Sequence, residues 1–319
     1  MDLSLFFAGT AGSVPTARRG LPALLLRRGG DRLLFDCGEG TQRQLLRSVG
    51  LPDLDRVFLT HLHIDHWLGL IGMLKSFDLR DRAAPLAVHG PRGTSELMGT
   101  MRRIYGRLGY PFVVTEVEPG DRVAFDGYAV TALKAEHRGT ALSYAIVEDT
   151  RPGHLDSELA QRLGVPFGPD LGRLQRGETV NGVAPEQVIG PQRPGRKVVL
   201  SGDTQPSEMV AVAAHEADVL VHEATFGQDE LPRAQQTGHS TATQAAELAR
   251  DAGVRMLALT HLSPRYMGRE LRDEARAIFP ATVVPRDFDT IEIPFPEKGE
   301  PELVRWPGQT AETAPPVAP

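Results

Sequence analysis

One short run of the chain is dense in side chains that bind metal ions: His61-Leu62-His63-Ile64-Asp65-His66. It follows an apolar stretch that predicts a strand, residues 56–60. Alternate side chains of an extended chain point the same way, so His61 and His63 can hold one ion together. The turn beyond brings Asp65 and His66 to a second ion. Imidazole and carboxylate ligands without thiolate suit zinc, and manganese or iron also fit.

Further ligands are expected at other strand ends, because an α/β fold gathers its site there. His137, Asp203 and His261 each follow an apolar, strand-like stretch. Taken singly, each of these residues could equally be a structural polar group and not a metal ligand. Taken as a set, they complete the ligands of two metal ions. The phrases Phe58-Leu59-Thr60-His61-Leu62 and Ala258-Leu259-Thr260-His261-Leu262 resemble each other, which indicates two equivalent halves that meet at the site.

Apolar runs that predict strands alternate with helical patterns over nearly the whole length. The spacing predicts helices over Thr94–Tyr105, Ser207–Ala214 and Thr241–Ala252, the last with Gly253 just past its end. This alternation is typical of an α/β layered fold.

Residues 149–195 break the alternation, because Gly and Pro supply 14 of these 47 residues and the hydrophobic periodicity is weak. The stretch is too long for an ordinary connection in a compact domain. It is either a disordered surface insertion or an arm that grips a partner or substrate.

The C-terminal residues 297–319 finish in a Pro-rich sequence that predicts a disordered tail without a catalytic role.

Composition excludes several classes of protein. No apolar stretch is long enough to span a membrane, and the N-terminus lacks the basic leader of a secretion signal. Cys37 is the only cysteine, so no internal disulfide forms, which fits a cytoplasmic protein.

With 35 basic and 41 acidic residues the formal net charge is −6, which argues against a protein that holds nucleic acid by its overall charge. A polyanionic substrate would need metal ions or local patches. Arg102, Arg103 and Arg107 are candidates for a phosphate-contacting face, but a solvated helix surface is the favoured interpretation.

The metal-binding run, with the later His, Asp and His, resembles the metallo-β-lactamase superfamily. More specific phrases resemble one branch of it, the ribonuclease Z family of endonucleases, which trim the 3′ end of precursor tRNA. The resemblance runs from about residue 3 to 295. The phrases that carry it are Asp36-Cys37-Gly38-Glu39-Gly40-Thr41-Gln42, His89-Gly90-Pro91-Arg92-Gly93, Ser201-Gly202-Asp203-Thr204, His222-Glu223-Ala224-Thr225-Phe226 and His239-Ser240-Thr241.

The resemblance implies a four-layer αββα sandwich over residues 1–296, with residues 149–195 inserted as a protruding arm. It implies two zinc ions per subunit, with manganese or another divalent metal as the alternative. His61, His63 and His137 would hold one ion, Asp65, His66 and His261 the other, and Asp203 would bridge them. The arm would grip the tRNA elbow through its Gly168-Pro169 element. Because the arm has five arginines against six acidic residues, this grip does not follow from its charge.

The site residues also predict a mechanism for phosphodiester hydrolysis. Two metal ions lower the pKa of water and neutralise charge on the phosphate. Asp65 would orient or deprotonate that water. His239, outside both ligand groups, would protonate the departing 3′ oxygen, with Glu223 as the partner that keeps it charged. The alternative for His239 is a structural hydrogen bond at a helix start.

Together these features predict a metal-dependent endoribonuclease whose partner is precursor tRNA and which, by the resemblance, forms a homodimer. The products would be a tRNA 3′-hydroxyl and a 5′-phosphorylated trailer. The nearest alternative is a small-molecule phosphodiesterase or arylsulfatase-like hydrolase on the same dinuclear site, which would have no need of a long arm. An RNA- or protein-binding module with a structural metal is disfavoured, because a structural zinc is usually closed by four ligands, whereas seven candidate ligands are present here.

Overall fold

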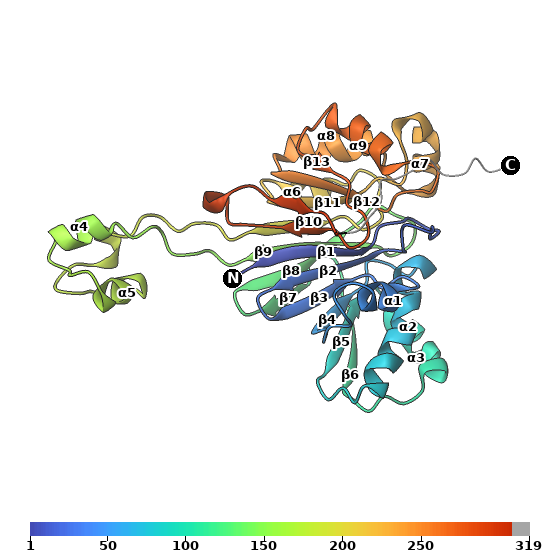
Figure 1. Cartoon of the computed structure of the whole chain (residues 1–319), viewed down its shortest axis with the longest axis horizontal. Coiled ribbons are helices and arrows are strands. Elements are labelled where there is room, and N and C mark those ends of the chain that lie inside the picture. The colour runs from blue at the N-terminus through green and yellow to red at the C-terminus, as the bar shows by residue number, and fades with distance from the viewer. Residues whose placement is uncertain (308–319) are drawn as a thin grey trace. The chain divides into compact units, whose positions relative to one another are not determined.

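Two β-sheets organise residues 1–307, the part of the chain that the computed structural model describes (Figure 1). The first sheet has the order β15-β14-β1-β2-β3-β4-β5-β6. Its strands are β1 (Leu3–Gly9), β2 (Ala23–Arg28), β3 (Asp31–Phe35), β4 (Arg56–Phe58), β5 (Leu86–Gly90), β6 (Phe112–Glu116), β14 (Thr290–Glu292) and β15 (Glu302–Val304). From β3 to β6 the neighbours are parallel, whereas β14, β1, β2 and β3 pair antiparallel.

The second sheet has the order β13-β12-β11-β10-β9-β8-β7. Its strands are β7 (Arg122–Phe125), β8 (Tyr128–Lys134), β9 (Leu142–Glu148), β10 (Lys197–Leu200), β11 (Val219–Glu223), β12 (Met256–Thr260) and β13 (Thr282–Val283). Strands β10 to β13 are parallel, so their carboxyl ends share one edge of the sheet.

Helices cover the outer face of each sheet, as Figure 1 shows. The first sheet is covered by α1 (Thr41–Leu46), α2 (Ile64–Leu79) and α3 (Thr94–Tyr105); the second by α6 (Glu208–Ala214), α8 (Ala242–Ala252) and α9 (Gly268–Arg276). The remaining helical segments outside residues 147–196 are η2 (Gln228–Glu230), α7 (Leu231–Thr237) and η3 (Pro296–Lys298).

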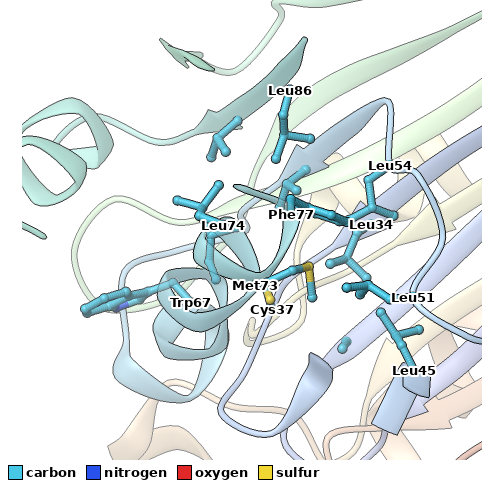
Figure 2. Packing of buried hydrophobic residues seen from close by; sticks show 14 of the residues in the cluster. Leu34, Cys37, Leu45, Leu51, Leu54, Trp67, Met73, Leu74, Phe77 and Leu86 are labelled. Carbon is cyan, nitrogen blue, oxygen red and sulfur yellow. The ribbon is translucent and has the colours of Figure 1, made fainter. Parts of the chain in front are cut away.

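The cores explain why these layers associate. Trp67, Met73, Leu74 and Phe77 of α2 are buried against Leu34 and other strand residues of the first sheet (Figure 2). Each such side chain contributes about 1.5–3 kcal/mol on burial. Alanines of α8 pack closely on the second sheet. Between the sheets, the ring of Tyr144 on β9 lies with its centroid 5.6 Å from Phe35 and 5.4 Å from Phe58. The four-layer αββα prediction is confirmed.

Residues 147–196, with residues 125–129, form a second compact unit. It contains α4 (Ser157–Arg162), α5 (Pro169–Gln175) and η1 (Pro185–Gln187) around a small core. That core consists of Ala160, Val165, Leu171, Leu174, Val180, Val183 and Val188. A buried ion pair joins its ends, since Arg196 Nε lies 2.7 Å from Glu148 Oε2. The predicted insertion, residues 149–195, lies within this unit and is folded.

The segments that sequence patterns located best are the amphipathic ones. Helix α3 spans the predicted residues, and α8 starts after Thr241, whose hydroxyl accepts from the backbone N–H of Gln244. Helix α2 was not predicted, because it is apolar on most sides and contains Gly69 and Gly72. Gly69 has a packing reason: a Cβ there would lie 2.0 Å from the carbonyl oxygen of Gly38.

The predicted tail begins too early at residue 297. Residues 302–304 form β15, which pairs antiparallel with β14, and Trp306 packs edge-on against Phe288 at 5.8 Å. These contacts make the stretch up to residue 307 part of the fold, whereas residues 308–319 lie outside the described part of the chain. Within residues 1–307, no helix has the length and apolar character needed to cross a bilayer.

Candidate metal centre and active site

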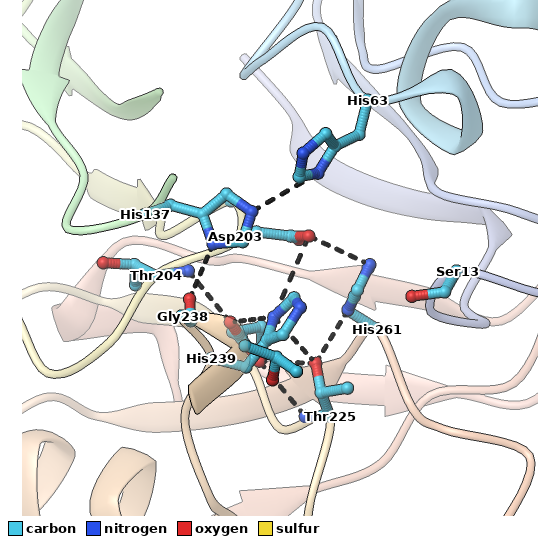
Figure 3. Close-up of polar contacts among 12 residues, drawn as sticks. Ser13, His63, His137, Asp203, Thr204, Thr225, Gly238, His239 and His261 are labelled. Carbon is cyan, nitrogen blue, oxygen red and sulfur yellow. Dashed lines mark hydrogen bonds and ion pairs between the residues drawn. The ribbon is translucent and has the colours of Figure 1, made fainter. Parts of the chain in front are cut away.

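The predicted ligands converge because each lies just beyond a strand. His61 and His63 lie in the loop between β4 and α2, and Asp65 and His66 are in the first turn of α2. His137 lies between β8 and β9. Asp203 follows β10 and His261 follows β12, two strands whose carboxyl ends share an edge. The structure brings all seven side chains together, and Figure 3 shows several of them.

The first group of ligand atoms comprises His61, His63, His137 and Asp203. His63 Nδ1 lies 2.9 Å from His61 Nε2 and 3.3 Å from His137 Nε2, while His61 Nε2 lies 3.7 Å from Asp203 Oδ2. His61 and Asp203 are buried, whereas His63 is exposed. This group therefore opens toward solvent on the His63 side.

The second group comprises Asp65, His66 and His261, all buried. The Nε2 atoms of His66 and His261 lie 3.5 Å and 3.6 Å from Asp65 Oδ2. The same two atoms lie 3.4 Å and 3.2 Å from Asp203 Oδ2. Asp203 therefore adjoins both groups through one oxygen. Burial disfavours its charge, but His261 and His66 outweigh burial and hold the pKa of Asp203 well below its usual range.

Metal ions fit this donor set. Within the described residues, the buried Nε2 atoms of His66 and His261 have no hydrogen-bond partner, although both face the cluster. A buried imidazole nitrogen without a partner is costly unless a cation occupies its lone pair. Nitrogen and carboxylate ligands of this kind suit zinc. The two groups could thus hold two neighbouring ions.

A buried carboxylate just after β3 holds ligand side chains of the first sheet in place through hydrogen bonds. Asp36, at a backbone φ of 57°, accepts hydrogen bonds from the N–H of Thr60 at 2.8 Å and from His66 Nδ1 at 2.8 Å. The Thr60 hydroxyl lies 2.9 Å from Asp36 Oδ2 and 3.1 Å from His61 Nδ1. The sequence alone did not indicate this role of Asp36, although the residue belongs to one of the phrases that resemble the ribonuclease Z family.

A second buried carboxylate, Glu223 at the end of β11, supports the other side. Its Oε1 accepts from His239 Nδ1 at 2.8 Å and from the N–H of Thr204 at 2.9 Å. Its Oε2 accepts from the Thr225 hydroxyl at 2.6 Å. Burial lowers the pKa of His239, but Glu223 outweighs it and raises the pKa to about 9. The predicted pair of Glu223 and His239 is thus in direct contact.

His239 also belongs to a third possible ligand group, with Asp203 and His261. The nitrogen of His239 near Asp203 is Nδ1, at 3.9 Å, and that atom is already bonded to Glu223. A bonded Nδ1–H cannot also coordinate a metal. The structure therefore favours a role for His239 outside both metal groups.

The loop after β1 closes the site from another side. The N–H of Ser13 donates to Asp65 Oδ2 at 3.0 Å, and the N–H of Gly12 donates to the carbonyl of Leu262 at 3.0 Å. A Cβ on Gly12 would lie 2.6 Å from His261 Nδ1, so only glycine fits beside this ring. The sequence alone gave no sign of this contact.

A basic cavity lies next to the same loop. It has a volume of about 610 Å³ and its lining includes residues 15–20, two residues beyond Ser13. Arg43 of α1 and Arg47, the residue after α1, line it together with Arg18 and Arg286, against the acids Glu39 and Asp287. Charge on this surface is thus locally positive despite the negative net charge of the chain.

The predicted arm residues Gly168 and Pro169 lie in the second unit, where Pro169 is the first residue of α5. Phe167, just before them, is 77% exposed. Cys37 is fully buried, which agrees with a packed residue and not a nucleophile.

Known proteins resemble the chain over nearly its whole length. Residues 20–173 match the family model of the metallo-beta-lactamase superfamily, and residues 172–262 match that of the beta-lactamase superfamily domain. The chain is 45% identical to ribonuclease Z of Natronomonas pharaonis, covering 93% of this chain and 100% of that protein. It is 46% identical to ribonuclease Z of Haloferax volcanii, covering 92% and 96%.

Solved structures agree with these relatives. Human tRNase Z, short form, superposes with a TM-score of 0.67 at 26% identity, covering 92% of this chain and 100% of that one. The metallo-beta-lactamase fold protein YhfI from Bacillus subtilis gives 0.68 at 21% identity, with 92% and 100% covered. The second match bears on the fold alone.

Replacing Asp203 should release metal from both groups, because its carboxylate adjoins both. We expect Asp203→Ala to weaken the binding of both ions by about 10-fold or more. His63→Ala, the matched comparison, should weaken only one ion, since His63 belongs to the first group alone. Metal content after dialysis, measured by inductively coupled plasma mass spectrometry, distinguishes the two. Full metal retention in Asp203→Ala would contradict the shared role.

Proposed function

The chain belongs to the ribonuclease Z family of metal-dependent endoribonucleases, and from that premise we propose that it hydrolyses the phosphodiester at the 3′ end of precursor tRNA. The products are a tRNA 3′-hydroxyl and a 5′-phosphorylated trailer. The observation that carries the proposal is the convergence of seven ligand side chains into two neighbouring groups, with Asp203 in the first and in contact with the second.

His61, His63, His137 and Asp203 would hold one metal ion, and Asp65, His66, His261 and Asp203 the other. When bound, such ions lower the pKa of water and neutralise charge on the phosphate. Asp65 orients the attacking water. Burial raises the pKa of its carboxyl, but the neighbouring imidazoles of His261 and His66 outweigh burial and keep that pKa well below its usual range, so Asp65 is ionised. The N–H of Ser13 fixes the same oxygen.

His239 donates a proton to the departing 3′ oxygen. Its Nδ1 is bonded to Glu223, so Nε2 is the nitrogen left to face the substrate. The raised pKa supports a protonated ring at neutral pH. The alternative role at a helix start is less well supported, because Thr241 caps α8 and Ser240 bonds the carbonyl of Thr204.

The basic cavity supports a polyanionic substrate. Its arginines adjoin the loop whose Ser13 contacts Asp65, so phosphates of an RNA strand that enters the site would pass beside them. Contacts of this kind position a nucleic-acid backbone without reading its sequence.

The second unit serves as the tRNA-gripping arm in this proposal. Its charges are largely engaged with one another: Arg173 contacts Asp170 and Glu178, and Arg176 contacts Glu178. Attraction by net charge is therefore weak there. The exposed ring of Phe167 beside Gly168 and Pro169 offers a stacking surface instead.

Three finer features belong to the same proposal: zinc as the metal, a homodimer as the assembled state and a cytoplasmic location. The ligand chemistry supports zinc. Membership of the family supports the other two.

Incubation with a 3′-extended precursor tRNA tests the proposal. We expect one cut at the 3′ end of the tRNA body, abolished by a chelator and restored by zinc. Bis-p-nitrophenyl phosphate serves as the small reference substrate. Hydrolysis of small diesters without cleavage of precursor tRNA would overturn the proposal in favour of a small-molecule phosphodiesterase.

Deletion of residues 151–190 tests the arm, and it leaves both members of the Glu148–Arg196 pair in the chain. Loss of the elbow contact should lower kcat/KM for precursor tRNA by about 100-fold, or ~2.7 kcal/mol of transition-state binding. Hydrolysis of bis-p-nitrophenyl phosphate should be unchanged. Equal effects on both substrates would show that the arm is not a tRNA-binding element.

The double variant Arg43→Gln/Arg47→Gln tests the basic cavity. Removing two phosphate contacts should reduce the slope of log affinity against log salt by about 1–2. Binding is measured by fluorescence anisotropy of labelled precursor tRNA at several salt concentrations. Arg102→Gln/Arg103→Gln on α3 is the matched control, because these arginines are exposed and lie outside the cavity. An unchanged slope in the cavity variant would contradict its role.

A further inference from the structure

The hydroxyl of Thr225 lies between two functional groups of the site. Its Oγ1 is 2.6 Å from Glu223 Oε2 and 2.8 Å from His261 Nδ1, and the residue is buried (Figure 3). His261 belongs to the second metal group, whereas Glu223 bonds His239 through its other oxygen. One hydroxyl thus touches both the metal group and the pair proposed to supply the proton.

The number of available protons fixes how these atoms bond. An ionised carboxylate only accepts hydrogen bonds, so the Thr225 hydroxyl donates its one proton to Glu223. The hydroxyl oxygen must then accept from His261, whose Nδ1 carries the hydrogen. This tautomer leaves the lone pair on Nε2, the buried atom that faces Asp65 and Asp203 without a hydrogen-bond partner among the described residues.

The other half of the site contains the same arrangement. The Thr60 hydroxyl lies 2.9 Å from the carboxylate of Asp36 and 3.1 Å from His61 Nδ1. His61 Nε2 faces the first metal group. A threonine just beyond a strand thus links a buried carboxylate to a ligand histidine twice, once after β4 of the first sheet and once after β11 of the second, which makes a chance contact at Thr225 a poor explanation.

We propose that Thr225 is a positioning residue that fixes the tautomer and orientation of His261 and thereby sets the affinity of the second metal ion. Through the same hydroxyl it ties that ion to the Glu223–His239 pair. The inference rests on the metal groups of the proposed function, but it concerns how tightly and where an ion binds, not which substrate is cut.

Titration with zinc alone tests this role. The variant Thr225→Val keeps the shape of the side chain but removes the hydroxyl, and Thr225→Ser keeps the hydroxyl. We expect Thr225→Val to weaken one of two zinc-binding steps by about 10- to 100-fold, and Thr225→Ser to stay near the wild type. Competition with a chromogenic chelator measures both steps.

Thr282→Val is the matched control, since that hydroxyl is also buried and bonds a backbone carbonyl away from the site. It should leave both zinc steps unchanged. Equal weakening by Thr225→Val and Thr225→Ser, or none by Thr225→Val, would overturn the proposal. If Thr225→Val fails to fold, ¹⁵N imidazole spectra of the zinc-loaded wild type decide instead: hydrogen on Nδ1 of His261 supports the role, and hydrogen on Nε2 refutes it.

A failure of this proposal can be distinguished from a failure of the proposed function. A wild-type protein that binds two zinc ions but leaves precursor tRNA intact would contradict the proposed substrate. The zinc titrations would still decide the role of Thr225. A wild type that binds no zinc would overturn both.

Discussion

A buried carboxylate surrounded by imidazoles is the constraint on which the site depends. Asp203 is 3% exposed, and Oδ2 lies within 3.7 Å of three ring nitrogens. Taking such an anion out of water costs several kcal/mol, roughly, unless positive charge is close by. Asp65 adds a second anion beside it. Cations bound between them remove this cost, so metal binding and the ordering of the surrounding loops are one linked equilibrium.

The two sheets contribute equivalent parts to this arrangement. On each side, a buried carboxylate accepts one histidine directly and reaches a second through a threonine hydroxyl. On one side both histidines face the metal groups. On the Glu223 side, only His261 faces a metal group, whereas Nδ1 of His239 is bonded to Glu223. A small departure from symmetry thus separates His261, which faces the metal groups, from His239, the proposed proton donor.

Sequence patterns were sufficient for the parts of the molecule that depend on neighbours along the chain or on shared strand edges. The ligands after β4, β10 and β12 could be proposed because parallel strands end together. Strand β9 was missed because it is buried on both faces and carries polar groups. Its Ser143 and Tyr144 are satisfied by the carbonyls of Ser201 and Leu59, partners that no local pattern reveals. The role of Thr225 could not be predicted from the sequence for the same reason, since only the fold shows which groups its hydroxyl contacts.

The ion pair between Glu148 and Arg196 has a consequence for the segment that it encloses. Both side chains are at most 5% exposed, and they close a loop of 47 intervening residues that has a core of its own. Once the ends of a loop are fixed, doubling its length adds only about 0.6 kcal/mol of closure entropy. The enclosed unit is therefore free to lengthen, shorten or be exchanged at little thermodynamic cost to the strands that flank it. Closing the insertion at its base in this way lets recognition evolve separately from chemistry.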